Sequence, residues 1–196
     1  IYFFQRNLLY HPSVNGYQND EENFDYVEVL IQNNEGIKLK AWLHEKDLIN
    51  KKTILFFHGN AGNLANRNYK LNELSKFDVN FLIVAYRGFS NNHGKPTEKG
   101  LYEDAKSSLD WLKLKGVKEK NLILYGESLG TAVAIETAQN KNLAGIILES
   151  PFTSMLELAQ KYYPVLPVKF LLKDKYETVN KLPNVTSPIL VLHGKL

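Results

Sequence analysis

Residues 126–130, GESLG, decide the fold, because this pentapeptide stands between an apolar run at 121–125 and a helical pattern at 129–140. A tight turn from strand to helix pushes the serine side chain out above a sheet, and the two glycines avoid collisions with neighbouring elements. Ser128 also stands at the start of the helix, where the helix dipole and free backbone N–H groups favour negative charge. We predict that Ser128 is a nucleophile. The alternative is a tight turn whose serine only caps a helix.

The sequence around this turn alternates between buried strands and helices. Short and almost continuous apolar runs are typical of strands that are covered on both faces, and helices between such strands imply a parallel sheet. Two alternating runs near the N-terminus, joined by a turn at residues 33–36, predict a hairpin. The predicted hairpin strands are 24–31 and 37–44, the later strands are 53–57, 80–85, 121–125, 143–148 and 189–192, and the helices are 61–76, 97–115 and 129–140.

Length and composition exclude several classes of protein. The chain has 196 residues, of which 44% are hydrophobic, so we predict a single domain over 1–196 and exclude intrinsic disorder. The absence of cysteine excludes disulfides and thiolate catalysis. The 24 basic residues are scattered among 21 acidic ones, so no nucleic-acid partner is expected. The longest apolar runs are far shorter than the roughly 20 residues of a spanning helix.

A second motif lies at the carboxyl end of an earlier strand, where ligands bind in open parallel sheets. His58, Gly59 and Asn60 follow the run 53–57. Acyl transfer passes through a tetrahedral oxyanion, and losing one of its N–H donors costs about 3 to 4 kcal/mol. We predict the backbone N–H groups of Asn60 and Leu129 as these donors.

Together, these motifs resemble the α/β-hydrolase superfamily, and more closely its BEM46-like branch, which includes the ABHD13-type proteins. The resemblance covers nearly the whole chain and rests on the ordered segments 58–63 (HGNAGN), 86–89 (YRGF), 94–100 (GKPTEKG), 126–130 (GESLG), 149–152 (ESPF) and 193–194 (HG).

This resemblance implies a three-layer α/β fold with a mostly parallel sheet. It also implies a serine hydrolase that cleaves an ester or thioester of a small acyl substrate, with no metal and no cofactor. Members of the branch often carry an N-terminal membrane anchor, and residues 1–12 resemble the segment that follows it. The chain starts with Ile1, so we expect a preceding segment to have been removed. Both a cytoplasmic and a membrane-anchored location fit, and the oligomeric state is open.

The partners of Ser128 are harder to find. In this fold the order along the chain is serine, then an acid, then histidine. Only His193 follows Ser128, and it stands where the family leads into its acid. We therefore expect the acid, the base and the last strand and helix of the fold to lie beyond Leu196.

Within the chain, Glu149 and Asp174 are the acids near the expected edge. Glu149 is the candidate acid, and its alternatives are a place in the pocket wall or an ion pair with Arg87. His58, Tyr86 and Glu149, all at strand ends, are the candidate pocket residues.

Residues 151–188 break the alternation and carry most of the prolines and an apolar, aromatic cluster. This excursion is either a helix that covers the core or a lid that lines an acyl pocket. Two other functions stay open. A truncated product would be a non-catalytic binding or interaction module with an exposed sheet edge. An amidase or peptidase would share every residue named above.

Overall fold

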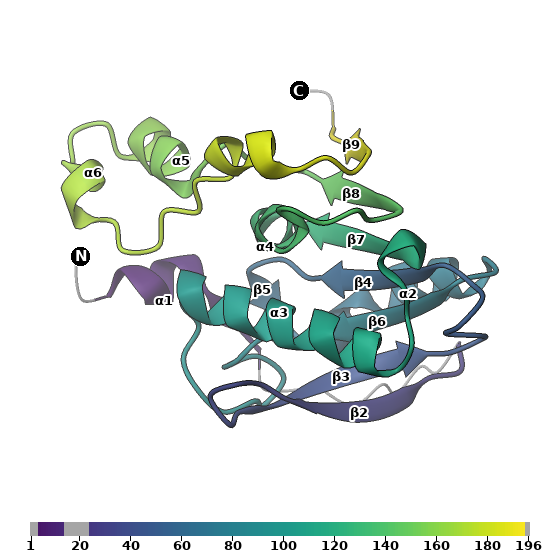
Figure 1. Ribbon diagram of the computed structural model, residues 1–196. Helices are drawn as coiled ribbons and strands as arrows, with labels where there is room; N and C mark the ends of the chain where they lie inside the picture. The colour runs from purple at the N-terminus through teal and green to yellow at the C-terminus, as the bar shows by residue number, and fades with distance from the viewer. Residues whose placement is uncertain (1–3, 14–23, 195–196) are drawn as a thin grey trace.

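The apolar runs form the centre of a seven-stranded sheet in the computed structural model, which describes residues 4–13 and 24–194 (Figure 1). The strand order is β2-β3-β6-β4-β7-β8-β9, and β6, β4, β7, β8 and β9 are mutually parallel. The prediction of a mostly parallel sheet is confirmed. The strands are β2 Val27–Gln32, β3 Lys38–His44, β4 Thr53–Phe57, β6 Asn80–Val84, β7 Leu122–Glu127, β8 Gly145–Glu149 and β9 Ile189–Leu192.

The predicted hairpin is also present, as antiparallel β2 and β3. Its turn is built by Asn33, whose side-chain oxygen accepts hydrogen bonds from the N–H groups of Glu35 and Ile37 at 3.0 and 2.9 Å. Gly36 has a φ of +80°, a region that glycine enters without steric cost. The hairpin therefore places β3 against β6 as the antiparallel extension of the sheet.

Helices cover both faces of the sheet. Figure 1 shows α3 (Glu98–Leu114) and α4 (Leu129–Ala138) in front of the strands and α2 (Asn68–Ser75) behind them. The hydroxyl of Thr97 caps α3 by accepting a hydrogen bond from the N–H of Gly100 at 2.9 Å. The helix predicted over 61–76 is shorter than expected. Asn63 caps a 3₁₀ turn, η1 (Leu64–Arg67), and the α-helix begins only at Asn68.

A buried ionic cluster ties the hairpin turn to α3. Arg87 donates through Nη2 to the carboxylate of Asp104 at 2.8 Å, and the Asn33 side chain donates to the same carboxylate at 2.8 Å. Arg87 also pairs with Glu35. The proposed pairing of Arg87 with Glu149 is therefore wrong, because Asp104 and Glu35 already neutralise the guanidinium.

The excursion over 151–188 is neither a strand nor one covering helix. It contains α5 (Met155–Tyr162), α6 (Val168–Leu171) and a 3₁₀ helix, η3 (Val179–Asn184). α5 begins after Ser154, whose hydroxyl accepts from the N–H of Glu157 at 3.0 Å. In Figure 1, α5 and α6 stand at one end of the molecule, away from the hairpin.

The N-terminal segment was not predicted to have structure. It forms α1 (Gln5–Leu9) and β1 (His11–Pro12), and β1 pairs in parallel with the short β5 (Ala61–Gly62). Residues 1–3 of the segment 1–12 lie outside the described residues. Among the described helices, none is long and apolar enough to cross a membrane.

Candidate active site

Ser128 occupies a strained turn between β7 and α4. Its φ is +50°, a conformation that residues other than glycine rarely adopt, and the residue is exposed. The flanking glycines are required by close backbone contact. A Cβ at Gly126 would lie 2.5 Å from the carbonyl oxygen of Gly130. A Cβ at Gly130 would lie 2.6 Å from the carbonyl carbon of Phe57, and closer still to its oxygen.

Backbone hydrogen bonds hold the turn in place. The N–H of Ser128 donates to the carbonyl of Glu149 at the end of β8, at 2.9 Å. The carbonyl of Ser128 accepts from the N–H of Thr131 at 2.9 Å and from its hydroxyl at 2.6 Å. The position of Ser128 is therefore set by β8 and by the first turn of α4, as well as by its own strand.

An ion-pair network supports this turn from the side of α2. Lys70 pairs with Glu127 at 3.0 Å and with Glu149 at 2.5 Å, and Arg67 pairs with Glu127 at 3.3 Å. The Lys70 ammonium also lies 5.7 Å from the centre of the Tyr125 ring. The two glutamates that flank Ser128 in the sheet thus share one lysine.

The carboxylate of Glu149 takes part in this network through two short contacts. Tyr125 donates to its carboxylate at 2.5 Å, as Lys70 does. Burial opposes ionisation, but the hydrogen bonds from Lys70 and Tyr125 outweigh it and hold the pKa of Glu149 below its ordinary value. Glu149 is not among the residues that line the cavity described next, so the structure does not place it in the pocket wall.

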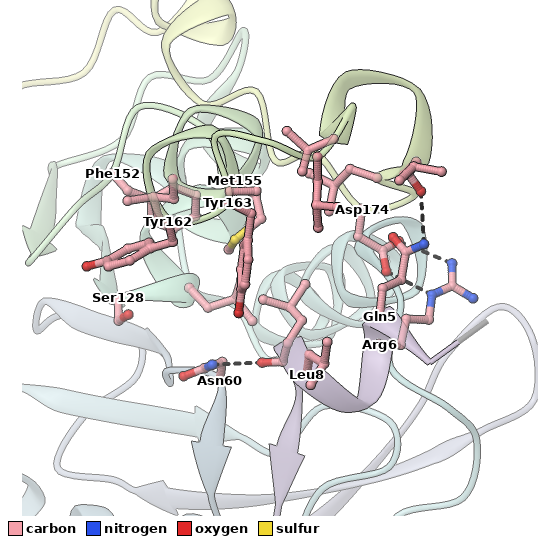
Figure 2. A pocket seen from close by; sticks show the side chains of 18 residues that line it. Gln5, Arg6, Leu8, Asn60, Ser128, Phe152, Met155, Tyr162, Tyr163 and Asp174 are labelled. Carbon is pink, nitrogen blue, oxygen red and sulfur yellow. Dashed lines mark hydrogen bonds and ion pairs between the residues drawn. The ribbon is translucent and has the colours of Figure 1, made fainter. Parts of the chain in front are cut away.

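An apolar cavity of about 360 Å³ lies beside Ser128. Figure 2 shows the side chains that line it, with Ser128 at one end. The volume of the cavity lies within the range of small-molecule sites. Asn60 and Leu129 line the same cavity as Ser128, so the structure brings the serine and both predicted donor residues together. The apolar wall comes mainly from the excursion and from α1, and includes Leu8, Leu9, Phe152, Met155, Leu158, Tyr162, Tyr163 and Leu166.

The loop of Asn60 is held by the N-terminal segment. The Asn60 side chain donates to the carbonyl of Leu9 at 2.7 Å, and the Asn60 carbonyl accepts from the N–H of His11 at 2.8 Å. This contact was missed by sequence reasoning. It joins residues 51 positions apart, and no local pattern in a five-residue helix indicates it.

His58 and Tyr86 lie beneath this loop, not in the pocket wall as predicted. Both are fully buried and absent from the cavity lining. The Tyr86 hydroxyl donates to the carbonyl of His58 at 3.2 Å. Burial and the nearby Arg67 charge lower the pKa of His58 to about 3, so its imidazole is neutral. The two residues support the loop from below.

The far end of the cavity is polar. Arg6 forms a two-pronged pair with Asp174, with distances of 2.8 and 3.2 Å. Gln5 donates to the carbonyl of Leu171 at 2.9 Å and accepts from the N–H of Lys173 at 2.7 Å. Asp174, a candidate acid by sequence, is therefore a partner of Arg6. α1 and the excursion form one wall although they are far apart in the chain.

The cavity contains no histidine among its described lining residues, and Asp174 is the acidic residue there. His193 follows β9, where its Nδ1 lies 2.9 Å from the carbonyl of Gly194. Within residues 4–13 and 24–194, no cluster of three or more His, Asp or Glu residues is arranged to hold a metal ion. The described site thus combines Ser128, Asn60 and Leu129 with a mainly apolar cavity.

Comparison with known proteins agrees with this geometry. The hydrolase family described as "Serine aminopeptidase, S33" matches residues 49–173. An uncharacterized protein of Mycobacterium tuberculosis is 32% identical over 193 residues, which cover 97% of this chain and 69% of that protein. The human alpha/beta hydrolase domain-containing protein 17B is 34% identical over 148 residues, which cover 74% of this chain and 49% of that protein.

A solved α/β-hydrolase structure from Vibrio vulnificus superposes with a TM-score of 0.74 at 26% identity, covering 88% of this chain and 65% of that one. Fold and family thus agree on one class: the protein has the α/β-hydrolase fold. The chain belongs to the serine aminopeptidase S33 family of hydrolases. It spans about half to two thirds of the length of these relatives.

Proposed function

We propose that the protein is a serine hydrolase that cleaves a carboxylic ester or thioester through an acyl-enzyme on Ser128. One observation carries the proposal. An exposed serine with a φ of +50° stands at the start of α4 and at the end of an apolar cavity, beside Asn60 and Leu129. This arrangement supports the proposal of a nucleophile elbow beside an oxyanion hole.

The reaction follows from this arrangement. The Ser128 oxygen attacks the carbonyl carbon of the substrate while its proton passes to a general base. Negative charge develops on the carbonyl oxygen, and the N–H groups of Leu129 and Asn60 stabilise it. The alcohol or thiol leaves with a proton, and water then attacks the acyl-enzyme and regenerates the Ser128 hydroxyl. The apolar wall binds the acyl chain.

The cavity favours esters or thioesters over an aminopeptidase reaction, although the matched family takes its description from aminopeptidases. A peptide's N-terminal ammonium needs an available carboxylate. Among the described lining residues, the carboxylate is that of Asp174, and Arg6 already pairs with it. The remaining wall is mainly apolar, which suits an uncharged acyl chain.

The test is labelling with a fluorophosphonate probe, which reacts with activated serines. The 196-residue chain and a chain extended to the length of its relatives are each compared with their Ser128→Ala and Ser150→Ala variants. Ser150 is a matched control, because it is also exposed and has a φ of +52°. We expect the extended protein and its Ser150→Ala variant to be labelled, and the Ser128→Ala variant to stay unlabelled.

Two outcomes would contradict the proposal: an extended protein that stays unlabelled, or labelling that survives Ser128→Ala. The first outcome favours the non-catalytic interaction module. Ester, thioester and amide substrates with the same acyl chain then separate the reaction classes. Amide cleavage as fast as ester cleavage would favour the amidase or peptidase alternative.

A further inference from the structure

The segments that form the outer wall of the cavity carry exposed apolar side chains. Val165 is 93% exposed, Phe170 84% and Tyr162 71%. They come from α5, α6 and the turn between them, and α1 adds exposed residues beside them, because Gln5 and Arg6 bond to residues 171–174. We call this surface the rim. It consists of Phe4, Leu8, Tyr162, Tyr163, Val165 and Phe170.

A substrate in the cavity does not account for the whole rim. Leu8, Tyr162 and Tyr163 line the cavity, and Figure 2 shows both tyrosines beside it. Val165 and Phe170 are not among the lining residues. Their side chains stay in water whether or not an acyl chain fills the cavity. Large apolar side chains that gather exposed on neighbouring segments are typical of an interaction site.

The charge of the rim indicates its partner. Residues 159–173 contain Lys161, Lys169 and Lys173, all exposed, and no acidic residue. α1, which packs beside them, contributes Arg6 and no acid. The ion pair of Arg6 with Asp174 adds no net charge to this surface, and the carboxylate of Glu157 accepts a hydrogen bond from the hydroxyl of Thr153. Lysines interspersed with aromatic and aliphatic side chains are typical of surfaces that bind anionic lipid.

We propose that the rim binds the surface of an anionic lipid bilayer. Val165 and Phe170 enter the interfacial region, and Lys161 and Lys169 contact the headgroup phosphates. Since Tyr162 and Tyr163 belong to both the rim and the cavity, the cavity mouth faces the bilayer. This proposal goes beyond the serine hydrolase function and does not depend on it, because binding requires no chemistry at Ser128.

Vesicle co-sedimentation tests the proposal with the Ser128→Ala variant of the 196-residue chain and of the extended chain, so that lipid hydrolysis plays no part. Vesicles of phosphatidylcholine with phosphatidylserine are compared with vesicles of phosphatidylcholine alone. We expect binding to the anionic vesicles that weakens as salt rises, and binding to the neutral vesicles that is at least about tenfold weaker.

The rim variants are a Val165→Ser, Phe170→Ser double variant and a Lys161→Gln, Lys169→Gln double variant. Each should lower the partition coefficient on anionic vesicles by about tenfold or more. Matched controls change equally exposed residues elsewhere: Tyr69→Ser with Leu114→Ser, and Lys106→Gln with Lys118→Gln. The controls should bind like the parent chain.

A Phe170→Trp variant reports on the rim directly. Its fluorescence should shift to shorter wavelength when anionic vesicles are added, whereas the fluorescence of a Tyr69→Trp variant should not respond. Three results would overturn the proposal: no binding at low salt, rim variants that bind as well as the controls, or fluorescence of the extended Phe170→Trp chain that vesicles leave unchanged. The last result would mean that another part of the polypeptide covers the rim.

Self-association is measured in parallel by size-exclusion chromatography. If the rim variants abolish a dimer but leave vesicle binding intact, the rim is an interface between two copies and the lipid proposal fails. The lipid-binding proposal and the serine hydrolase proposal can also be refuted independently of each other. A protein that binds vesicles but stays unlabelled by fluorophosphonate keeps the rim as a lipid surface and loses the hydrolase function.

Discussion

The carboxyl edge of the sheet and the outer wall of the cavity meet at Ser128, but they are built in opposite ways. At the edge, backbone contacts backbone: Gly130 lies against the carbonyl of Phe57, and the N–H of Ser128 bonds to Glu149. The outer wall joins α1 to the excursion through side chains such as Arg6 with Asp174, in segments 168 residues apart. At the edge, close backbone contacts leave the atoms no room to move. In the wall, a few polar side-chain pairs hold α1 against the excursion.

This difference separates two tasks. The edge holds the groups that the chemistry needs within narrow limits, and side-chain substitutions there disturb buried backbone. The wall determines the shape of the apolar cavity, and many of its side chains are exposed. We therefore expect substitutions at the edge to affect stability much more than substitutions in the wall.

The largest effect is expected for Gly130→Ala. The new Cβ would overlap the backbone of Phe57 and lie 2.9 Å from the carbonyl oxygen of His58, and buried backbone cannot move away. The free energy of unfolding should fall by about 3 kcal/mol or more, as measured by urea denaturation. Gly145→Ala is the control, because its Cβ would meet nothing closer than 3.7 Å. Equal stability of the two variants would refute the steric account.

The second effect is a loss of stability in acid that depends on His58. Its folded pKa is about 3 and its unfolded value is 6.5. Below pH 6.5 the unfolded chain therefore binds a proton that the folded protein excludes, and stability falls as the pH falls. We expect a loss of about 2 kcal/mol between about pH 7 and pH 5 from this group.

Urea denaturation at several pH values measures this slope. It should become shallower in a His58→Gln variant and stay unchanged in His93→Gln, which alters an exposed loop histidine. A slope that is the same in all three proteins would mean that His58 titrates normally in the fold.

A smaller effect concerns the hydrogen bond that links the N-terminal segment to the excursion. The hydroxyls of Tyr10 and Tyr176 are buried and lie 2.7 Å apart. Replacing either by phenylalanine leaves the other hydroxyl without this partner, at a cost of about 1 to 2 kcal/mol. The double variant should cost no more than one single variant, which gives a coupling energy of about 1 to 2 kcal/mol in a double-mutant cycle. Strictly additive costs would argue against the bond.

The smallest effect on overall stability is expected for Arg6→Gln in the wall. The Arg6 side chain is 41% exposed and that of Asp174 is 6% exposed, but Asp174 keeps the hydrogen bond from the N–H of Glu98, so we expect a cost of about 1 kcal/mol. The urea midpoint should fall only slightly. Amide hydrogen exchange at His11 and Ser13 should nevertheless become faster, because β1 loses part of its attachment. Unchanged exchange would show that Arg6 does not hold the N-terminal segment.

Sequence reasoning found the edge because its signals are local. Each apolar strand run, the GESLG turn and the His58-Gly59-Asn60 motif lies within a few residues, and the structure brings Ser128, Asn60 and Leu129 to one cavity. Reasoning from strand ends was less successful for side-chain direction. His58 and Tyr86 follow strands as predicted, but their rings point into the core, where desolvation makes a charged form costly.

The partners of the charged side chains also could not be predicted from the sequence. Glu149 stands at the end of β8 as expected, but the sequence does not show that Lys70 from α2 reaches across to it. The sequence likewise does not show that Arg87 pairs with Asp104 on α3. Such partners are determined by the packing of helices on the sheet, which the positions of the acids in the sequence do not show.

The sequence by itself determined the α/β class, the strands of the sheet and the serine at the strained turn, because periodicity and glycine spacing act over short distances along the chain. Only the tertiary structure decided that α1 and the excursion enclose the cavity. Their contacts join residues 166 to 168 positions apart, and such contacts depend on where the folded sheet places each segment, which no local pattern records.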